Sequence, residues 1–481
     1  MAVVNDAPTL DLDADNSSGA TGADYQRTYT ENAAPRLIID PTDATLADID
    51  SANLAWLTVT ITNQLDGTAE LLSANTAGTG VTASYNPGTG VLTLNGADTV
   101  ANYQQVLRTV RYENLSDAPS LAPRVITFVA SDDGVQASNT ATSTVTISPV
   151  NDGPTADIAL AFYSAIENST LALAGTGISV DDVDAGSSPV TVTLSVISGL
   201  LTATAGGTGV VVTNSGTPWL TLSGTVAQIN DLLDGLSGAT LDYIVASDSP
   251  PPTDDLNLWI DDNGATGAGV PLGAGDWALI NVTAVNDAPV ITLPGFATTA
   301  EDTPLVFAGA SQISITDVDA GGAPVEVTLN VSTGVLNLSG TTGLGFSAGA
   351  NGTATMTFAG TVADINTALN GLTFMPNANF SGAAFLTLGV NDQGNTGVGG
   401  ALSDGPELAM ITVTPVNDLP SGATNAISMP QDTSRPFGVA DFGFTDVDAG
   451  DTMIAVRIGT LSIPPGATLQ LSGANVTTGQ V

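Results

Sequence analysis

The sequence predicts an all-β protein made of tandem modules, each with many short strands and one short helix. Three observations carry this prediction. The phrase Val-Asn-Asp-X-Pro occurs four times, with its Asn at positions 5, 151, 286 and 417. After each of the first three copies, segments of alternating apolar and polar residues recur in the same order, separated by turns rich in Gly, Asn and Asp. One segment with a helical period recurs at the same place in each interval.

The spacing of this phrase divides the chain. Its Asn positions lie 146, 135 and 131 residues apart, which suits a whole domain better than one unit of a solenoid. A chain of 481 residues also exceeds what a single hydrophobic core usually holds. We therefore expect three modules and an incomplete fourth, and we interpret the phrase as a joint whose Pro keeps the backbone extended. The predicted modules are 1–150, 151–285, 286–416 and 417–481.

Alternation and periodicity place the main elements within the modules. A helical period marks one segment per module, and in the third the stripe 362, 365, 369 and 372 should pack into the core. Thr361 with Asp364 resembles a capping box at the start of that segment. The predicted strands are 57–61, 125–129, 142–147, 190–196 and 325–331, and the predicted helices are 99–110, 225–236 and 361–372.

Composition excludes several classes of function. Asp and Glu number 48 against 7 Arg and Lys, giving a formal net charge of −41, which repels nucleic acid and anionic membranes and attracts divalent cations. Cys and His are absent, so the chain has no thiolate or imidazole chemistry and no zinc site of the usual kind. All seven bases are Arg, which also removes Schiff-base catalysis. Neither a signal peptide nor a membrane-spanning run is evident, so no membrane insertion is expected.

Oxygen-bearing side chains recur at four places in each module. These are the Asn-Asp of the joint, a Glu, an Asp-X-Asp loop and an Asp-containing turn. A single Asp or Asn in a turn is common because both residues tolerate tight backbones. Several carboxylates gathered at one place repel each other unless a cation is present. Oxygen ligands without nitrogen or sulfur suit Ca²⁺, and alternation should place both carboxylates of Asp-X-Asp on one side of an extended segment.

The order of these motifs resembles the calcium-site segments of cadherin repeats. The similar segments include Glu167-Asn168, Asp182-Val183-Asp184-Ala185-Gly186 and the Asp-Gly turns. The joint and the helix phrase that begins at Thr361 resemble more specifically the cadherin-like tandem repeats of large secreted, RTX-type bacterial adhesins. The resemblance covers essentially the whole chain and rests on the common order of the motifs more than on any one of them.

This resemblance implies Greek-key β-sandwiches of about seven strands, strung end to end, with Ca²⁺ at each joint. Carried over residue by residue, it implies four composite sites. From the N-terminus, their ligands are Asn5, Asp6, Asp48, Asp50 and Asp132; then Glu31, Asn151, Asp152, Asp182, Asp184 and Asp262; then Glu167, Asn286, Asp287, Asp317, Asp319 and Asp392; and then Glu301, Asn417, Asp418, Asp446 and Asp448.

The sequence departs in several ways from the cadherins and adhesins that it resembles. The mid-repeat Asp-Arg-Glu motif of animal cadherins is absent, which leaves the number of ions per joint open. Gln431 stands where the other modules carry Glu, and Asp48-Ile49-Asp50 is not followed by Ala-Gly. The chain has no Gly-Gly-X-Gly-X-Asp nonapeptides. The fourth module ends at Val481, before its helix and last strands, so we expect either a longer parent protein or completion by a neighbour.

The leading functional hypothesis is a calcium-rigidified, non-enzymatic spacer or adhesive region of a secreted or surface-bound bacterial adhesin. One alternative is a subunit of a self-assembling filament or surface layer, completed by a strand from a neighbour. Another is a glycan-binding module in which Trp259 faces outwards and stacks on a sugar, although packing against a neighbouring loop is the more ordinary role for it. Paired carboxylates also occur in glycosidases, but their recurrence in every module argues for a structural ion.

Overall fold

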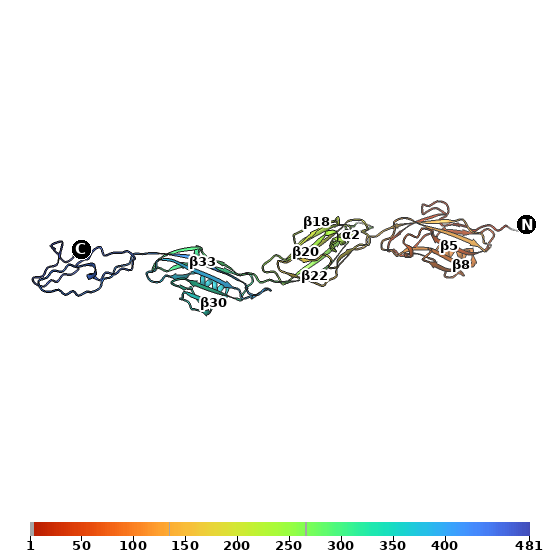
Figure 1. The fold of residues 1–481 in the computed structure, drawn as a ribbon. Helices are drawn as coiled ribbons and strands as arrows, with labels where there is room; N and C mark the ends of the chain where they lie inside the picture. The colour runs from red at the N-terminus through yellow and green to blue at the C-terminus, as the bar shows by residue number, and fades with distance from the viewer. Residues whose placement is uncertain (1–3, 134, 265–266) are drawn as a thin grey trace. The chain divides into compact units, whose positions relative to one another are not determined.

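The computed structural model describes residues 4–133, 135–264 and 267–481 (Figure 1). The chain forms two compact units, Met1–Ala284 and Val285–Val481. The first unit contains two β-sandwiches with separate hydrophobic cores, and the second unit contains one. Each sandwich consists of a six-stranded sheet, a three-stranded sheet, a two-stranded pair and one short α-helix. The predicted all-β class, with tandem sandwiches and one helix in each, is confirmed.

The first sandwich has the strand order β2-β11-β10-β5-β8-β7 in its large sheet and β3-β9-β6 in its small sheet, and β1 pairs with β4. Its elements are β1 Thr9–Asp11, β2 Tyr25–Thr30, β3 Arg36–Leu37, β4 Thr45–Ala47, β5 Asn53–Ile61, β6 Glu70–Ser73, β7 Thr82–Asn86, β8 Val91–Thr99, α1 Val100–Leu107, β9 Arg111–Asn114, β10 Arg124–Asp132 and β11 Ala141–Ser148.

The second sandwich repeats this arrangement, with the large-sheet order β13-β22-β21-β16-β19-β18 and the small-sheet order β14-β20-β17. Its elements are β12 Thr155–Ile158, β13 Phe162–Ile166, β14 Leu171–Ala172, β15 Ile178–Asp181, β16 Val190–Ser195, β17 Leu200–Thr204, β18 Val211–Thr213, β19 Trp219–Gly224, α2 Val226–Leu233, β20 Thr240–Ile244, β21 Thr253–Asp261 and β22 Gly273–Thr283.

The third sandwich has the large-sheet order β24-β33-β32-β27-β30-β29 and the small-sheet order β25-β31-β28. Its elements are β23 Val290–Thr292, β24 Phe296–Ala300, β25 Leu305–Phe307, β26 Ser314–Thr316, β27 Pro324–Val331, β28 Val335–Asn337, β29 Gly345–Ala348, β30 Thr355–Thr361, α3 Val362–Leu369, β31 Leu372–Met375, β32 Gly382–Asn391 and β33 Ser403–Thr414.

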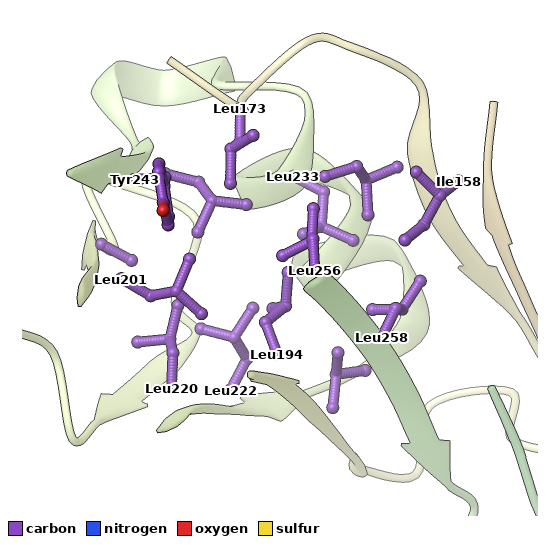
Figure 2. Packing of buried hydrophobic residues seen from close by; sticks show 14 of the residues in the cluster. Ile158, Leu173, Leu194, Leu201, Leu220, Leu222, Leu233, Tyr243, Leu256 and Leu258 are labelled. Atoms are coloured by element: carbon purple, nitrogen blue, oxygen red, sulfur yellow. The ribbon is translucent and has the colours of Figure 1, made fainter. Parts of the chain in front are cut away.

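The alternating strands build the cores as expected. In β16, Val190, Val192 and Leu194 are buried while the residues between them are half-buried, because successive side chains of a strand point to opposite faces. Figure 2 shows Leu194 packed with residues of the second sandwich that include Leu222 and Leu258, with Leu233 of α2 close by. In each large sheet the edge strand that comes first in the chain pairs parallel with the strand that comes last in the chain: β2 with β11, β13 with β22, and β24 with β33.

The three helices lie within the predicted segments but are shorter than predicted. The third ends at Leu369, because Gly371 adopts a positive φ of 91° and Leu372 starts a strand. The capping box predicted at Thr361 is only half formed: the Thr361 hydroxyl accepts from the Asp364 amide, but it also donates to the Asp364 carboxylate. The reciprocal box occurs instead in the second sandwich, between Thr225 and Gln228.

Residues 417–481, all of which the structure describes, form no sandwich. They contain a single 3-10 turn at Val439–Phe442 and the two-residue strands β34 Gln470–Leu471 and β35 Ala474–Asn475, and none of these residues is buried. No helix in the described part of the chain is long and apolar enough to cross a membrane.

Candidate metal centres

The joint at Asn151 is tied to the second sandwich by its own side chain. Asn151 is 8% exposed, and its Nδ2 donates to Asp262 Oδ2 at 2.6 Å and to the Val270 carbonyl at 3.2 Å. Asp262 is 1% exposed, and its other oxygen accepts from the Gly264 and Leu272 amides. The turn carboxylate therefore holds the joint in place through both of its oxygens.

The Asp-X-Asp loop of the same joint is a turn and not an extended segment. Asp182 Oδ1 accepts from the amides of Asp184 and Ala185, both at 2.9 Å, which closes the loop on itself. Gly186 then adopts a φ of 50°, which explains the Gly in the motif. The prediction of two carboxylates on one side of an extended segment was wrong, because the first carboxylate caps the backbone that carries the second. Asp184 Oδ2 instead accepts from the Asp152 amide at 2.5 Å.

Glu31 brings the first sandwich to this joint. It follows β2 and is 3% exposed, and its Oε2 accepts from the Val150 amide at 2.8 Å. The next residue, Asn32, adopts a left-handed backbone with a φ of 57°, and Asn168, Asp302 and Asp432 do the same at the equivalent positions. Asn and Asp tolerate this conformation better than other side chains do. The residue after each Glu thus has a conformational role, while the Glu itself points to the joint.

Three buried carboxylate oxygens at this joint have no hydrogen-bond donor among the described residues. They are Glu31 Oε1, Asp152 Oδ2 and Asp182 Oδ2. One oxygen each from Glu31, Asp152 and Asp117 also lies within 4.8 Å of the other two. A buried, ionised oxygen without a donor is costly, and several such oxygens close together repel each other. A divalent cation would remove both costs, so the donor set fits Ca²⁺.

The pKa shifts at the joint agree with a cation-binding role for these carboxylates. Burial, followed by the charges of Asp152, Asp184 and Asp117, raises the pKa of Glu31 despite the hydrogen bond from Val150. Burial and the neighbouring carboxylates of Asp152 and Asp182 likewise raise the pKa of Asp184. Burial also acts to raise the pKa of Asp262, but the hydrogen bonds from Asn151, Gly264 and Leu272 outweigh it and lower that pKa. Glu31 and Asp184 thus have raised pKa values at this joint, whereas the turn residue Asp262 has a lowered one.

The same arrangement occurs at the first and third copies of the joint phrase. Asn5 donates to Asp132, and Asn286 donates to Asp392, each at 2.6 Å. Each first Asp of the loop, Asp48 or Asp317, accepts two backbone amides through Oδ1 and leaves Oδ2 buried without a donor. The amides of Asp6 and Asp287 donate to Asp50 and Asp319, respectively. Gly134, in the predicted turn after Asp132, lies outside the described residues.

The fourth copy keeps part of the arrangement. The Val416 amide donates to Glu301 Oε1, and the Asp418 amide donates to Asp448 Oδ2, each at 2.6 Å. One oxygen each of Glu301, Asp418 and Asp448 lies within 4.8 Å of the others. Asp446 Oδ1 accepts from the Asp448 amide, as in the other loops. Asn417 is exposed, and among the described residues its side chain donates only to the neighbouring Asp418 carbonyl, because 417–481 carries no counterpart of the Asp262 turn.

The site predicted from Glu167 and the group Asn286, Asp287, Asp317, Asp319 and Asp392 stays a prediction. Glu167 belongs to the first unit, where its amide donates to the Thr283 carbonyl, and the other residues belong to the second unit.

The sequence interpretation missed some acidic residues. Asp117 lies in the loop between β9 and β10 and joins the cluster of Glu31 and Asp152, and Asp451 joins Asp446 and Asp448. Their signal was weak, because the Ser-Asp pair of Ser116-Asp117 also occurs at 131–132, 247–248 and 403–404. A further group, Asp13, Asp15 and Asp43, lies within the first sandwich and away from the predicted joints, where Asp13 accepts from the Ser17 and Ser18 amides.

Trp259 faces outwards, as one alternative predicted. It is 52% exposed in β21, between the buried Leu258 and Ile260. Its ring covers Gly273 and Gly275 of the adjacent strand β22, where any Cβ would come within 3 Å of the indole. The contact is thus with a strand and not with a loop, and the two Gly residues make room for it.

Comparisons with known proteins give a structural likeness only. No protein-family model matches the sequence, and no curated protein matches it. The chain is similar to Protocadherin Gamma B2 extracellular cadherin domains 1–5 (15% identity, TM-score 0.35), over 86% of this chain and 61% of that one. It is also similar to domains 3–6 of the same protein (15% identity, TM-score 0.33), over 89% of this chain and 82% of that one. A third similar structure is mouse Cadherin-23 EC22–24 (15% identity, TM-score 0.31), over 86% of this chain and 99% of that one. These are cadherin extracellular repeats; the bacterial adhesin family stays a prediction.

Calcium binding at the Asn151 joint should release protons in mildly acidic solution. Because the pKa values of Glu31 and Asp184 are raised above 4.5 and 3.8, the calcium-free folded chain holds more protons than the unfolded chain just above those values. The contribution of these two groups to stability is therefore present at lower pH and is lost as pH rises through the raised pKa values. Calcium binds the ionised form and expels these protons.

Titration calorimetry near pH 5, in two buffers with different ionisation heats, would measure this release. We expect it to shrink in Glu31→Gln and to vanish near pH 8. A heat of binding that does not depend on the buffer at the lower pH would contradict this linkage.

Proposed function

We propose that this chain is a non-enzymatic extracellular spacer whose modules are stiffened by calcium at their joints. The observation that supports this most is the set of three buried carboxylate oxygens without donors at the Asn151 joint. The repetition of the same backbone arrangement at Asn5 and Asn286, with a partial version at Asn417, supports one structural role over a single active site.

At the Asn151 joint, the residues that would hold the ion are Glu31, Asp117, Asp152, Asp182 and Asp184. Together they supply carboxylate oxygens only, which is the ligand type that Ca²⁺ prefers. Asn151 and Asp262 would position the joint. We propose the equivalent roles for Asp6, Asp48 and Asp50, for Asp287, Asp317 and Asp319, and for Glu301, Asp418, Asp446 and Asp448. Sites in extracellular modules typically have a Kd of about 10⁻⁴ to 10⁻³ M.

The mechanism is electrostatic. Without a cation, the carboxylates that gather at a joint repel each other, and the joint relieves this repulsion by opening. With Ca²⁺ bound, Glu31 from one sandwich and the Asp-X-Asp loop of the next share one ion, so the joint resists bending. In this proposal the modules run 1–150, 151–285 and 286–416, with 417–481 following the last joint, and the chain serves adhesion or spacing at a bacterial cell surface.

Small-angle scattering of the full chain, with calcium and with chelator, tests the proposal. We expect the radius of gyration and the maximum dimension to differ between the two conditions, with a narrower distribution of distances in calcium. Magnesium at the same concentration is the control, because its smaller ion demands a near-ideal octahedral site and keeps its water. Identical scattering curves with calcium and with chelator would reject the stiffening role.

A further inference from the structure

Three of the seven arginines line one cavity in the first sandwich. The cavity has a volume of about 340 Å³, and Arg27, Arg36 and Arg111 line it together with residues that include Tyr25, Pro35 and Pro41. The other four arginines lie at 108, 124, 435 and 457, so residues 125–434 contain no basic side chain at all. Basic charge in this strongly acidic chain is therefore concentrated at one place.

These three arginines are not paired with acids. Within the described part of the chain, the ion pairs belong to Arg124, with Asp66 and Glu70, and to Arg435, with Asp441. No carboxylate oxygen lies within 4.0 Å of a guanidinium nitrogen of Arg27, Arg36 or Arg111 among the described residues. With 48 acidic residues in the chain, acidic partners are abundant. The three guanidinium groups thus remain available to a ligand.

The three arginines come from strands β2, β3 and β9, and all three line this cavity. Arg27 lies between Tyr25 and Tyr29 in the edge strand β2, and because alternate residues share a face, it points to the same side as these two buried rings. Arg36 lies in β3 of the small sheet, directly opposite Tyr112, and Arg111 lies opposite Leu37. Arg111 Nη1 donates to the Pro35 carbonyl at 2.8 Å, which keeps its guanidinium at the start of β3. The cavity thus lies where the edge of one sheet meets the other sheet.

A second cavity adjoins the first and shares Tyr25 and Arg27 with it. Its volume is about 560 Å³, and its polar lining includes Ser17, Ser18, Gln26, Thr28 and Thr146. Asp40 is the acidic residue in its lining, and its carboxylate is already occupied, because it accepts from the Thr42 amide, the Thr42 hydroxyl and the Ser17 hydroxyl. The arginine cavity therefore has, on one side, a neighbouring cavity that is lined by hydroxyl and amide groups.

We propose that Arg27, Arg36 and Arg111 form a binding site for an acidic saccharide, with the sugar's carboxylate at the arginines and its hydroxyl groups towards the adjoining polar cavity. Guanidinium groups match carboxylates in charge and in their paired donors. At physiological ionic strength, charges farther away than about 8 Å are largely screened, so the net negative charge of the chain does not prevent local binding. This site is independent of calcium at the joints.

Saturation-transfer NMR on the full chain, in calcium-containing buffer, tests this proposal. Glucuronic acid is the probe, and glucose is the uncharged sugar used for comparison. We expect saturation transfer to glucuronic acid and none to glucose. The double variant Arg27→Gln/Arg36→Gln should bind glucuronic acid at least about tenfold more weakly, because each substitution removes a hydrogen bond to the charged carboxylate of the sugar. Arg457→Gln removes one positive charge outside the first sandwich and should bind normally.

Equal saturation transfer to glucuronic acid and glucose would overturn the proposal. Binding of glucuronic acid that survives in the double variant would overturn it as well, and would indicate that the sugar binds through calcium at a joint. Inorganic sulfate and phosphate separate a sugar site from a simple oxyanion site: if either binds as tightly as glucuronic acid, the saccharide assignment fails. A melting curve of the double variant that matches the wild type would show that the loss of binding is not a loss of folding, since Arg27 and Arg36 are exposed.

Discussion

Calcium is expected to raise the melting temperature of the chain, and Asp182→Asn is expected to remove the share that comes from the Asn151 joint. A ligand present at 100 times its Kd stabilises the folded state by about 2.7 kcal/mol per site. For modules of this size, this corresponds to a rise of roughly 10 °C. Differential scanning calorimetry over a calcium series, with chelator as the reference, would measure the rise for each transition.

The substitution Asp182→Asn isolates the ligand role. The Oδ1 atom of Asn can still accept from the Asp184 and Ala185 amides, so the loop keeps its turn. The change falls on the Oδ2 position, which is buried and has no donor in the wild type. The NH2 group that replaces Oδ2 in Asn cannot bind a cation. In chelator, the variant should be at least as stable as the wild type, because one of the crowded charges is gone.

Asp242→Asn is the matched control. Asp242 lies in β20 of the same sandwich, outside the joint, and the substitution removes the same charge. If Asp242→Asn reduces the calcium response as much as Asp182→Asn does, the response reflects net charge and not a site. If neither variant changes it, the joint is not where calcium binds.

Arg124→Met is expected to destabilise the first sandwich strongly. Arg124 is fully buried, and its guanidinium donates to Glu70, to Asp66 and to the carbonyl oxygens of Ser120 and Ala122. Removing one partner of a buried ion pair costs about 3–5 kcal/mol, because the remaining charge is left unpaired. Glu70 is fully buried as well, and one of its oxygens already lacks a donor. The melting transition of this sandwich should fall by roughly 10 °C or more.

Arg435→Met is the matched control, because the pair of Arg435 with Asp441 is solvent-exposed and such pairs contribute about 0–1 kcal/mol. The double variant Glu70→Leu/Arg124→Met should recover much of the loss, since it removes both buried charges. A drop in Arg124→Met no larger than that in Arg435→Met would show that the buried network contributes little. A double variant less stable than either single variant would show that an unpaired buried charge is not the cause of the loss in Arg124→Met.

The strands and helices could be predicted because their patterns are local. The alternation in β16 and the helical stripe of Val362, Ile365 and Leu369 each reflect a single inward face, and in the helix Ile365 and Leu369 are buried and Val362 partly buried. The helix ends could not be predicted as well. Leu372 fits the helical stripe, yet it is buried as the first residue of β31, because either element can place an apolar residue in the core.

The candidate joints were predictable in composition but not in geometry. The recurring order of Asn, Glu and Asp identified residues that the fold does bring together at Asn151. Which oxygen accepts a backbone amide and which one is left free depends on the path of the loop, and the sequence does not show this path. Asp117 reaches the cluster from a loop without a recurring phrase. The buried Arg124 was equally hidden, since the second and third modules contain no basic residue to mark the position.

The parallel pairing of β2 with β11 also determines how a sandwich bears a mechanical load. The chain enters the large sheet through β2 and leaves it through β11, and the two neighbouring strands run in the same direction from Tyr25–Ser143 to Thr30–Ser148. A force that pulls the two ends apart therefore acts along the strands and across their hydrogen bonds. All six paired positions are loaded in shear at once, whereas a peeling force would break them one after another. The β13–β22 and β24–β33 pairs share this geometry, so tension passes through every sandwich by the same shear-loaded pair.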